Sequence, residues 1–152
     1  YQAQQNDTLI RNFQGYADSE TQLMLGFGVS AISDYSVAML QNEKSLKSYY
    51  ESLDKQQNSF TKVVYRTKQD KQREQLIHHL LCQLNLPISL LPLNQFAEEW
   101  SKLKEFATLG LLEITQDQVS INQVGQIFIR NIAQVFDSYN KLSHVKGFSN
   151  AI

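Results

Sequence analysis

Two histidines and the only cysteine of the chain have the spacing of metal ligands on a helix. His78 and His79 precede Cys82 by four and three residues, and residues three or four apart share one face of a helix. A zinc site needs further ligands, yet the remaining histidine is the distant His144. Cysteine is also often a small buried hydrophobic residue. We therefore predict that Cys82 packs in the core, that the two histidines lie at the surface, and that no metal is bound.

Residues 26–33, with the sequence GFGVSAIS, are the other candidate for chemistry. Gly26 and Gly28 flank one aromatic residue, and the β-branched Val29 and Ile32 favour a strand. The third glycine of a dinucleotide-binding fingerprint is missing, and no nucleophile elbow, phosphate loop or pair of catalytic carboxylates occurs elsewhere. We interpret residues 26–33 as a strand whose edge lies close to a bound ligand.

Composition narrows the classes of function. Fourteen Lys and Arg residues against 15 Asp and Glu residues give a net charge of −1, so no overall charge favours nucleic acid or an anionic membrane. Hydrophobic residues make up 42% of the chain, which indicates a folded protein. One cysteine excludes an internal disulfide and a cluster held by several cysteines. We found no long apolar run and no leader, so we expect a cytoplasmic protein without membrane contact, and the start at Tyr1 suggests a piece of a longer chain.

The elements that must position these residues differ between the two halves. In the first half we predict short strands at residues 8–10 and 23–25 around a turn at residues 15–19, then the strand at residues 26–33. Asn42 is predicted to cap a helix, and a further strand should cover residues 60–65. This half reads as mixed strand and helix.

The second half has stronger helix signals. Thr67 and Asp70 form a capping-box pattern before one helix, and a second helix should begin at Asn94 and stop at Gly110. A loop at residues 87–92 should separate these two helices. A hairpin at residues 111–122 and a last helix at residues 128–139 should follow them. The order of helix, helix, hairpin and helix is typical of a winged helix. We predict an α+β, mainly helical chain with domains at residues 1–57 and 58–152.

Because winged-helix units often bind DNA, the helix at residues 95–109 is a candidate recognition helix. Its charges are two lysines and three glutamates, whereas contacts to phosphates require clustered Lys and Arg. A scaffold or covering role is favoured over nucleic-acid binding. A module that binds nucleic acid or protein stays open as the alternative.

Several sequence blocks, taken in order, resemble one enzyme family. RNFQGY at residues 11–16, GFGVSAIS at residues 26–33, and IRNI and FDSY within residues 129–139 are similar to the C-terminal third of the oxygen-independent coproporphyrinogen III oxidases. The resemblance runs from Thr8 to the end, including Phe148 and Ser149. The related haem-chaperone branch is less similar, because it is not expected to carry the first and last blocks.

The resemblance implies a parent enzyme that oxidatively decarboxylates two propionates of coproporphyrinogen III to vinyl groups, giving protoporphyrinogen IX in porphyrin biosynthesis. It implies S-adenosylmethionine and a [4Fe-4S] cluster as cofactors, with three cluster cysteines in an N-terminal catalytic barrel and a monomeric parent. Cys82 alone cannot hold such a cluster. We therefore expect this chain to be inactive alone, to form the end of a partial α/β barrel followed by the winged-helix-like domain, and to shape and cover the active site.

The resemblance also suggests ligand-binding residues but no catalytic one. Ile32 and Gln14 match family positions close to a bound S-adenosylmethionine. An apolar Ile32 could pack on that ligand and exclude water, and the Gln14 amide could orient it. Gly28 and Ser30 are expected to keep the backbone approachable, although ordinary strand packing would explain all four residues without a ligand.

Overall fold

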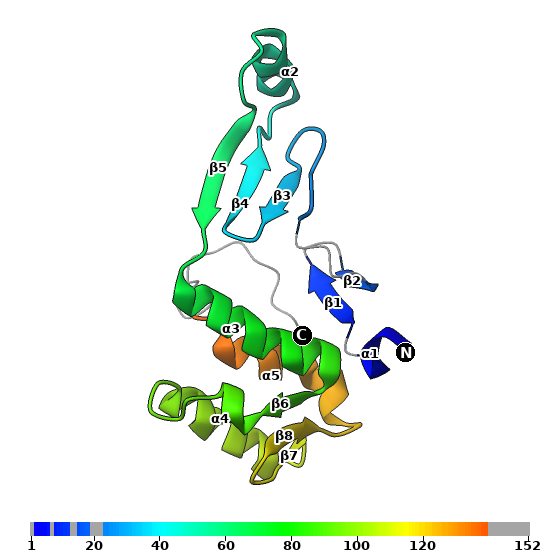
Figure 1. The fold of residues 1–152 in the computed structure, drawn as a ribbon, viewed down its shortest axis with the longest axis vertical. Coiled ribbons are helices and arrows are strands. Elements are labelled where there is room, and N and C mark those ends of the chain that lie inside the picture. Colours follow the sequence, from blue (N-terminus) through cyan, green and yellow to red (C-terminus); the bar gives the residue numbers. More distant parts are fainter. Residues whose placement is uncertain (1, 7, 13–14, 19–22, 140–152) are drawn as a thin grey trace. The chain divides into compact units, whose positions relative to one another are not determined.

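The computed structural model describes residues 2–6, 8–12, 15–18 and 23–139 (Figure 1). By its internal contacts the chain forms two compact units, one of residues 1–19 with 72–152 and one of residues 20–71. Both mix helices with sheets. The predicted domain boundary at residues 57 and 58 falls within the second unit, so these units divide the chain differently from the domains that we predict for the parent. In the described residues, no helix is long and apolar enough to cross a membrane.

The first unit combines an N-terminal hairpin with a helical body. Its described elements are α1 (Gln2–Gln5), β1 (Leu9–Asn12), β2 (Gly15–Asp18), most of α3 (Lys68–His78), a π-helical turn (His79–Gln83), β6 (Asn85–Pro87), a 3-10 turn (Ile88–Leu90), α4 (Ala97–Thr108), β7 (Leu112–Ile114), β8 (Gln118–Ile121), a second 3-10 turn (Gly125–Phe128), α5 (Ile129–Ala133) and a third 3-10 turn (Gln134–Phe136). Strands β6, β8 and β7 form an antiparallel sheet in that order.

The hydrophobic core of the chain lies in this unit. Phe96 and Phe136 are fully buried and meet edge to face, with ring centroids 5.9 Å apart, a favourable geometry for aromatic rings. The other buried apolar residues around them come from α3, the π-helical turn, α4, α5 and the sheet; they include Leu76, Leu80, Leu86, Leu91, Leu103, Leu112, Val119, Ile121 and Ile132.

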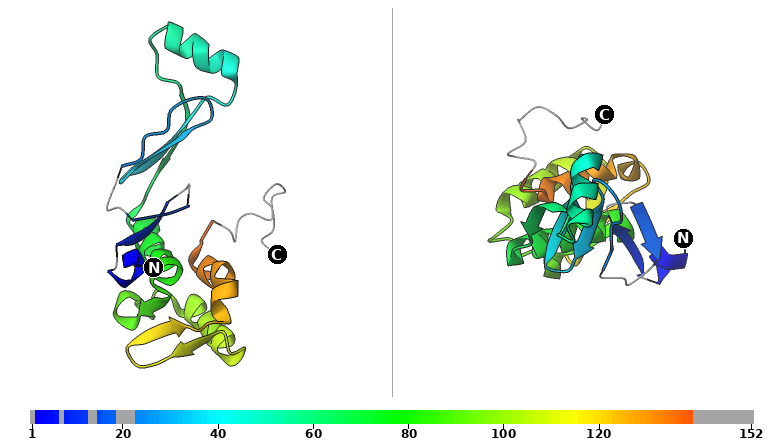
Figure 2. Two further views of the ribbon diagram at one scale, coloured as in Figure 1. Left: turned by 90° about the vertical axis from the view of Figure 1, so that its right-hand side faces the viewer. Right: turned by 90° about the horizontal axis from the view of Figure 1, so that it is seen from above.

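The second unit is a small sheet with one helix. Strands β3 (Ile32–Tyr35), β4 (Ala38–Asn42) and β5 (Phe60–Tyr65) are antiparallel in the order β3-β4-β5. Helix α2 (Leu46–Asp54) connects β4 to β5 and stands at that end of the sheet (Figure 2). All six residues of β5 are exposed and α2 buries none. Among the described residues of this unit, the buried ones are Ala38, Ser33 and Asn42, so this described part lacks an apolar core of its own.

The start of α3 and the end of α4 were predicted correctly from the residues at those positions. The Thr67 amide donates to Asp70 Oδ2 at 2.8 Å, and the Asp70 amide donates to Thr67 Oγ1 at 3.1 Å, which is the predicted capping box. Gly110 takes φ +73° directly after α4. The predicted cap at Asn42 is wrong: Ser45 caps α2 by accepting from the Ser48 amide.

Element boundaries differ from the predictions where pairing with a distant segment decides them. The predicted turn at residues 15–19 contains strand β2, because residues 15–18 pair antiparallel with β1. The predicted loop at residues 87–92 begins with the end of β6, which pairs with β8. Helix α4 starts at Ala97 instead of Asn94, and the predicted last helix is divided into α5 and two 3-10 turns.

Candidate functional site

Residues 26–33 form a loop that leads into a strand. The backbone turns at Gly28 and Ser30, which have φ +97° and +59°, and β3 begins only at Ile32. A positive φ is accessible to glycine but costly for most other residues. The prediction of a strand over residues 26–33 is therefore wrong, because an extended strand cannot contain two left-handed residues.

A buried asparagine holds this loop. Asn42 is 4% exposed, and its Nδ2 donates to the Gly28 carbonyl at 2.8 Å and approaches the Gly26 carbonyl at 3.5 Å. The Ser30 amide donates to the Glu43 carbonyl at 2.6 Å. Sequence reasoning missed this role of Asn42, because its partners lie 14 and 16 residues earlier in the chain. The loop is thus held by hydrogen bonds to the last residue of β4 and to the residue that follows it.

Gly26 is required by close packing. A Cβ atom on Gly26 would lie 2.5 Å from the Ile32 carbonyl oxygen, which is closer than real Cβ contacts come. The Gly26 amide also donates to Ser33 Oγ at 3.0 Å. A Cβ on Gly28 would instead meet nothing within 4 Å, so the space beside Gly28 is open.

Large apolar side chains lie exposed beside the loop. Leu25 is 51% and Phe27 87% exposed, and Ile32 is half-buried at the start of β3. Three predicted site residues, Ile32, Gly28 and Ser30, are therefore together in the second unit. The fourth, Gln14, lies outside the described residues. The loop thus presents exposed apolar side chains next to open space.

The chain does not offer a set of metal ligands in the part that the structure describes, where no three His, Cys, Asp or Glu side chains gather. Cys82 is fully buried, as predicted, and burial raises the pKa of its thiol to about 11 despite the nearby Arg11 charge. His78 and His79 are half-buried, so their predicted surface position is only partly correct. Burial, and secondarily His79, lowers the pKa of His78. A [4Fe-4S] cluster would therefore need cysteines from elsewhere in a parent protein.

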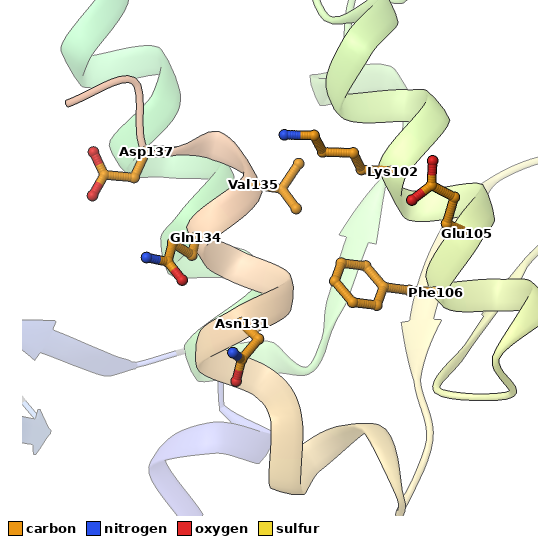
Figure 3. Close-up of a pocket in the computed structure, with 7 residues that line it drawn as sticks. All are labelled: Lys102, Glu105, Phe106, Asn131, Gln134, Val135 and Asp137. Carbon is orange, nitrogen blue, oxygen red and sulfur yellow. The ribbon is translucent and has the colours of Figure 1, made fainter. Parts of the chain in front are cut away.

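A shallow cavity of about 320 Å³ lies in the first unit between α4 and the α5 region (Figure 3). Charged and amide side chains surround Phe106 and Val135 there; the full lining is Lys102, Glu105, Phe106, Asn131, Gln134, Val135 and Asp137. None of the predicted site residues lines it. With one lysine against one glutamate and one aspartate, its lining carries a small excess of negative charge and does not favour an anionic ligand.

Helix α4 does not present a basic face. Its Glu99 is buried and pairs with Arg73, with 3.0 Å between Glu99 Oε1 and Arg73 Nη1. The helix therefore uses one of its charges for internal packing, and its two lysines share the helix with two further glutamates. Phosphate recognition requires clustered cations, so the geometry gives no support to a recognition helix.

Comparison with known proteins found similar bacterial enzymes. No family model matches the chain. The oxygen-independent coproporphyrinogen III oxidase of Salmonella typhimurium is 33% identical over 158 residues, which cover 99% of this chain and 35% of that protein. The enzyme of the same name from Thermostichus vulcanus is 34% identical over 99% of this chain and 49% of its own length. The chain thus spans about a third to a half of the length of these relatives.

A solved structure agrees with the sequence matches. Coproporphyrinogen III oxidase from Escherichia coli, a radical SAM enzyme, matches 90% of this chain and 33% of its own length with a TM-score of 0.84 and 36% sequence identity. At that identity the similarity reflects common descent as well as a common fold. The chain is therefore homologous, over 99% of its length, to the C-terminal part of oxygen-independent coproporphyrinogen III oxidase.

Proposed function

We propose that the parent of this chain is an oxygen-independent coproporphyrinogen III oxidase, which converts two propionates of coproporphyrinogen III to vinyl groups with loss of carbon dioxide. The observation that carries the proposal is the structural match at TM-score 0.84 and 36% identity over 90% of the chain. In such a parent, S-adenosylmethionine and a [4Fe-4S] cluster would supply the radical chemistry that removes hydrogen from a propionate. Within the parent this chain shapes the active site and contributes no catalytic residue.

In this proposal the loop at residues 26–33 is one wall of the site for S-adenosylmethionine. Ile32 packs against the nonpolar part of the ligand and excludes water. The left-handed turn at Gly28 and Ser30, held by Asn42, leaves open space beside the backbone. Gln14 offers an amide that can donate and accept.

The rest of the chain has a supporting part. We propose that residues 1–57 complete the catalytic barrel of the parent and that residues 58–152, a winged-helix-like domain, cover it. The exposed apolar side chains beside the loop and along β5 support this arrangement, since a folded protein normally buries such surface against a partner. Residues 1–152 without the rest of the parent are expected to have no catalytic turnover.

A substitution in the full-length parent tests the role of Ile32. Ile32→Asp should abolish anaerobic turnover, because a carboxylate beside the ligand attracts water and charge into an apolar wall. The visible spectrum of the cluster should stay unchanged. The matched control is Val37→Asp, in the exposed turn between β3 and β4, which should retain turnover.

Two results would contradict the proposal. Normal turnover of Ile32→Asp would remove Ile32 from the site. A parent without coproporphyrinogen-dependent activity, combined with DNA affinity that falls steeply with salt, would favour the nucleic-acid module instead.

A further inference from the structure

The turn at residues 28–31 has a conformation that its own residues do not favour. The Ala31 amide donates to the Gly28 carbonyl at 3.4 Å and closes the turn, and Ser30 stands in its third position with φ +59°. A positive φ at that position suits glycine or asparagine and costs other residues free energy. The β-branched Val29 also favours an extended strand. Such a conformation persists only where the surrounding structure enforces it.

The end of β4 enforces this turn through both its main chain and a side chain. The Asn42 amide donates to the Ala31 carbonyl at 2.9 Å, and the Ser30 amide donates to the Glu43 carbonyl at 2.6 Å. These main-chain contacts do not depend on the side chain at position 42. The Gly28 carbonyl is held differently, because it accepts from Asn42 Nδ2 at 2.8 Å. A substitution of Asn42 therefore releases Gly28 and leaves the main-chain anchors in place.

Asn42 is itself fixed by residues at the start of β5. Its Oδ1 accepts from Ser59 Oγ and its carbonyl accepts from Thr61 Oγ1, both at 3.4 Å. The side chain is buried, where a polar group without a partner is costly. Asparagine satisfies both ends of the site because its amide carries a donor and an acceptor, whereas an ionised aspartate only accepts.

Residues 41–43 contact each of the three proposed ligand residues that the structure describes. The pairs are Ile32 with Gln41, Ser30 with Glu43, and Gly28 with Asn42. The contact with Gly28 is made by a buried side chain, so it depends on the residue type at position 42. We propose that Asn42 is a positioning residue for S-adenosylmethionine: its amide holds Gly28 in the left-handed turn of the ligand wall. The inference rests on the proposed function.

Substitution of Asn42 in the cluster-loaded, full-length parent tests the proposal. Asn42→Asp keeps the size of the side chain but removes the donor to Gly28. Asn42→Ser shortens the side chain without adding charge, so it provides the test if a buried carboxylate prevents folding. When fewer molecules hold the competent turn, the dissociation constant for S-adenosylmethionine rises in proportion. We expect a rise of about tenfold, the factor for losing roughly one hydrogen bond.

The matched control is Asn58→Asp, the same chemical change at an exposed position before β5. Its dissociation constant for S-adenosylmethionine should stay within about twofold of wild type, as for other surface substitutions.

Gly28→Ala tests whether Asn42 acts through Gly28. Alanine rarely adopts the φ of +97°, yet its Cβ would meet nothing within 4 Å, so this change disturbs the turn without a clash. Because both substitutions release the same turn, Asn42→Asp combined with Gly28→Ala should bind S-adenosylmethionine within about threefold of the weaker single variant. Effects of the two changes that multiply would show independent roles and overturn the proposal.

Two measurements decide the outcome. Anaerobic equilibrium dialysis gives the affinity for S-adenosylmethionine, and amide hydrogen exchange shows which part of the second unit has changed. Weaker binding with faster exchange confined to residues 28–31 supports the proposal. Unchanged affinity overturns the positioning role, and so does weaker binding with faster exchange throughout β3, β4 and β5, which indicates a purely structural role. A wild-type parent that does not bind S-adenosylmethionine overturns the proposed function and this role with it.

Discussion

The buried ion pair between α3 and α4 makes a quantitative prediction about stability. The Arg73 side chain is 13% exposed and that of Glu99 5%. Arg73 Nη1 lies 3.0 Å from Glu99 Oε1, donates to the Phe136 carbonyl at 3.0 Å, and the guanidinium stacks on Phe96 at 5.0 Å. One group thus connects α3, α4 and the end of the α5 region in the middle of the core.

Glu99→Leu should destabilise the first unit strongly, because it leaves the Arg73 cation buried without its carboxylate. Removing one partner of a buried pair costs about 3–5 kcal/mol, which lowers the midpoint of thermal unfolding by roughly 6–20 °C for a protein of this size. Trp100, the single tryptophan, neighbours Glu99 on α4. Urea unfolding of the 152-residue chain, followed by Trp100 fluorescence, measures the change.

The double variant Arg73→Met with Glu99→Leu should be more stable than Glu99→Leu alone. It removes the uncompensated cation and the buried Arg73 Nε, which has no hydrogen-bond partner. The Phe136 carbonyl still loses its donor, so a residual cost of about 1–3 kcal/mol is expected. The control Glu105→Leu, an exposed position on the same helix, should change stability by less than about 0.5 kcal/mol. A double variant less stable than the single one would refute the reasoning.

Three further predictions concern single residues. Gly26→Ala should separate residue 26 from the start of β3, because the new Cβ would lie 2.5 Å from the Ile32 carbonyl oxygen. Amide hydrogen exchange in β3 should become faster, and unchanged exchange would contradict this prediction. The pKa of Cys82 is raised from 9.0 to about 11 in the folded protein. The contribution of the neutral thiol to stability is therefore complete below pH 9 and is lost as the pH rises toward 11. Urea unfolding at several pH values should show this loss in the wild type and not in Cys82→Ala. The pKa of His78 is lowered in the folded protein, so its effect on stability runs the other way. Its contribution to stability is present above pH 6.5 and is lost as the pH falls through the folded pKa. His78→Gln should therefore flatten the acid side of the profile of stability against pH.

The signals that sequence reasoning interpreted correctly are local. The Thr67 and Asp70 capping box, the Gly110 stop and strand β5 at residues 60–65 each depend on residues close together in the chain. The core position of Cys82 followed from its residue type and from the leucines around it. The resemblance to a known family reached further than these local signals. Several sequence blocks in the same order identify one family even where each block alone is a weak signal.

Tertiary structure decided what the sequence alone could not. Residues 15–18 are a strand because β1 lies beside them, and Asn42 holds the Gly26 and Gly28 carbonyls, 16 and 14 residues before it. The π-helical turn receives Gln4 from 78 residues away. A hydrogen bond between distant residues leaves no periodicity or spacing in the chain, since its partners meet only after the core has formed. The site residues proposed from the sequence therefore stay a prediction, and the contacts that hold the loop at residues 26–33 were decided by the fold.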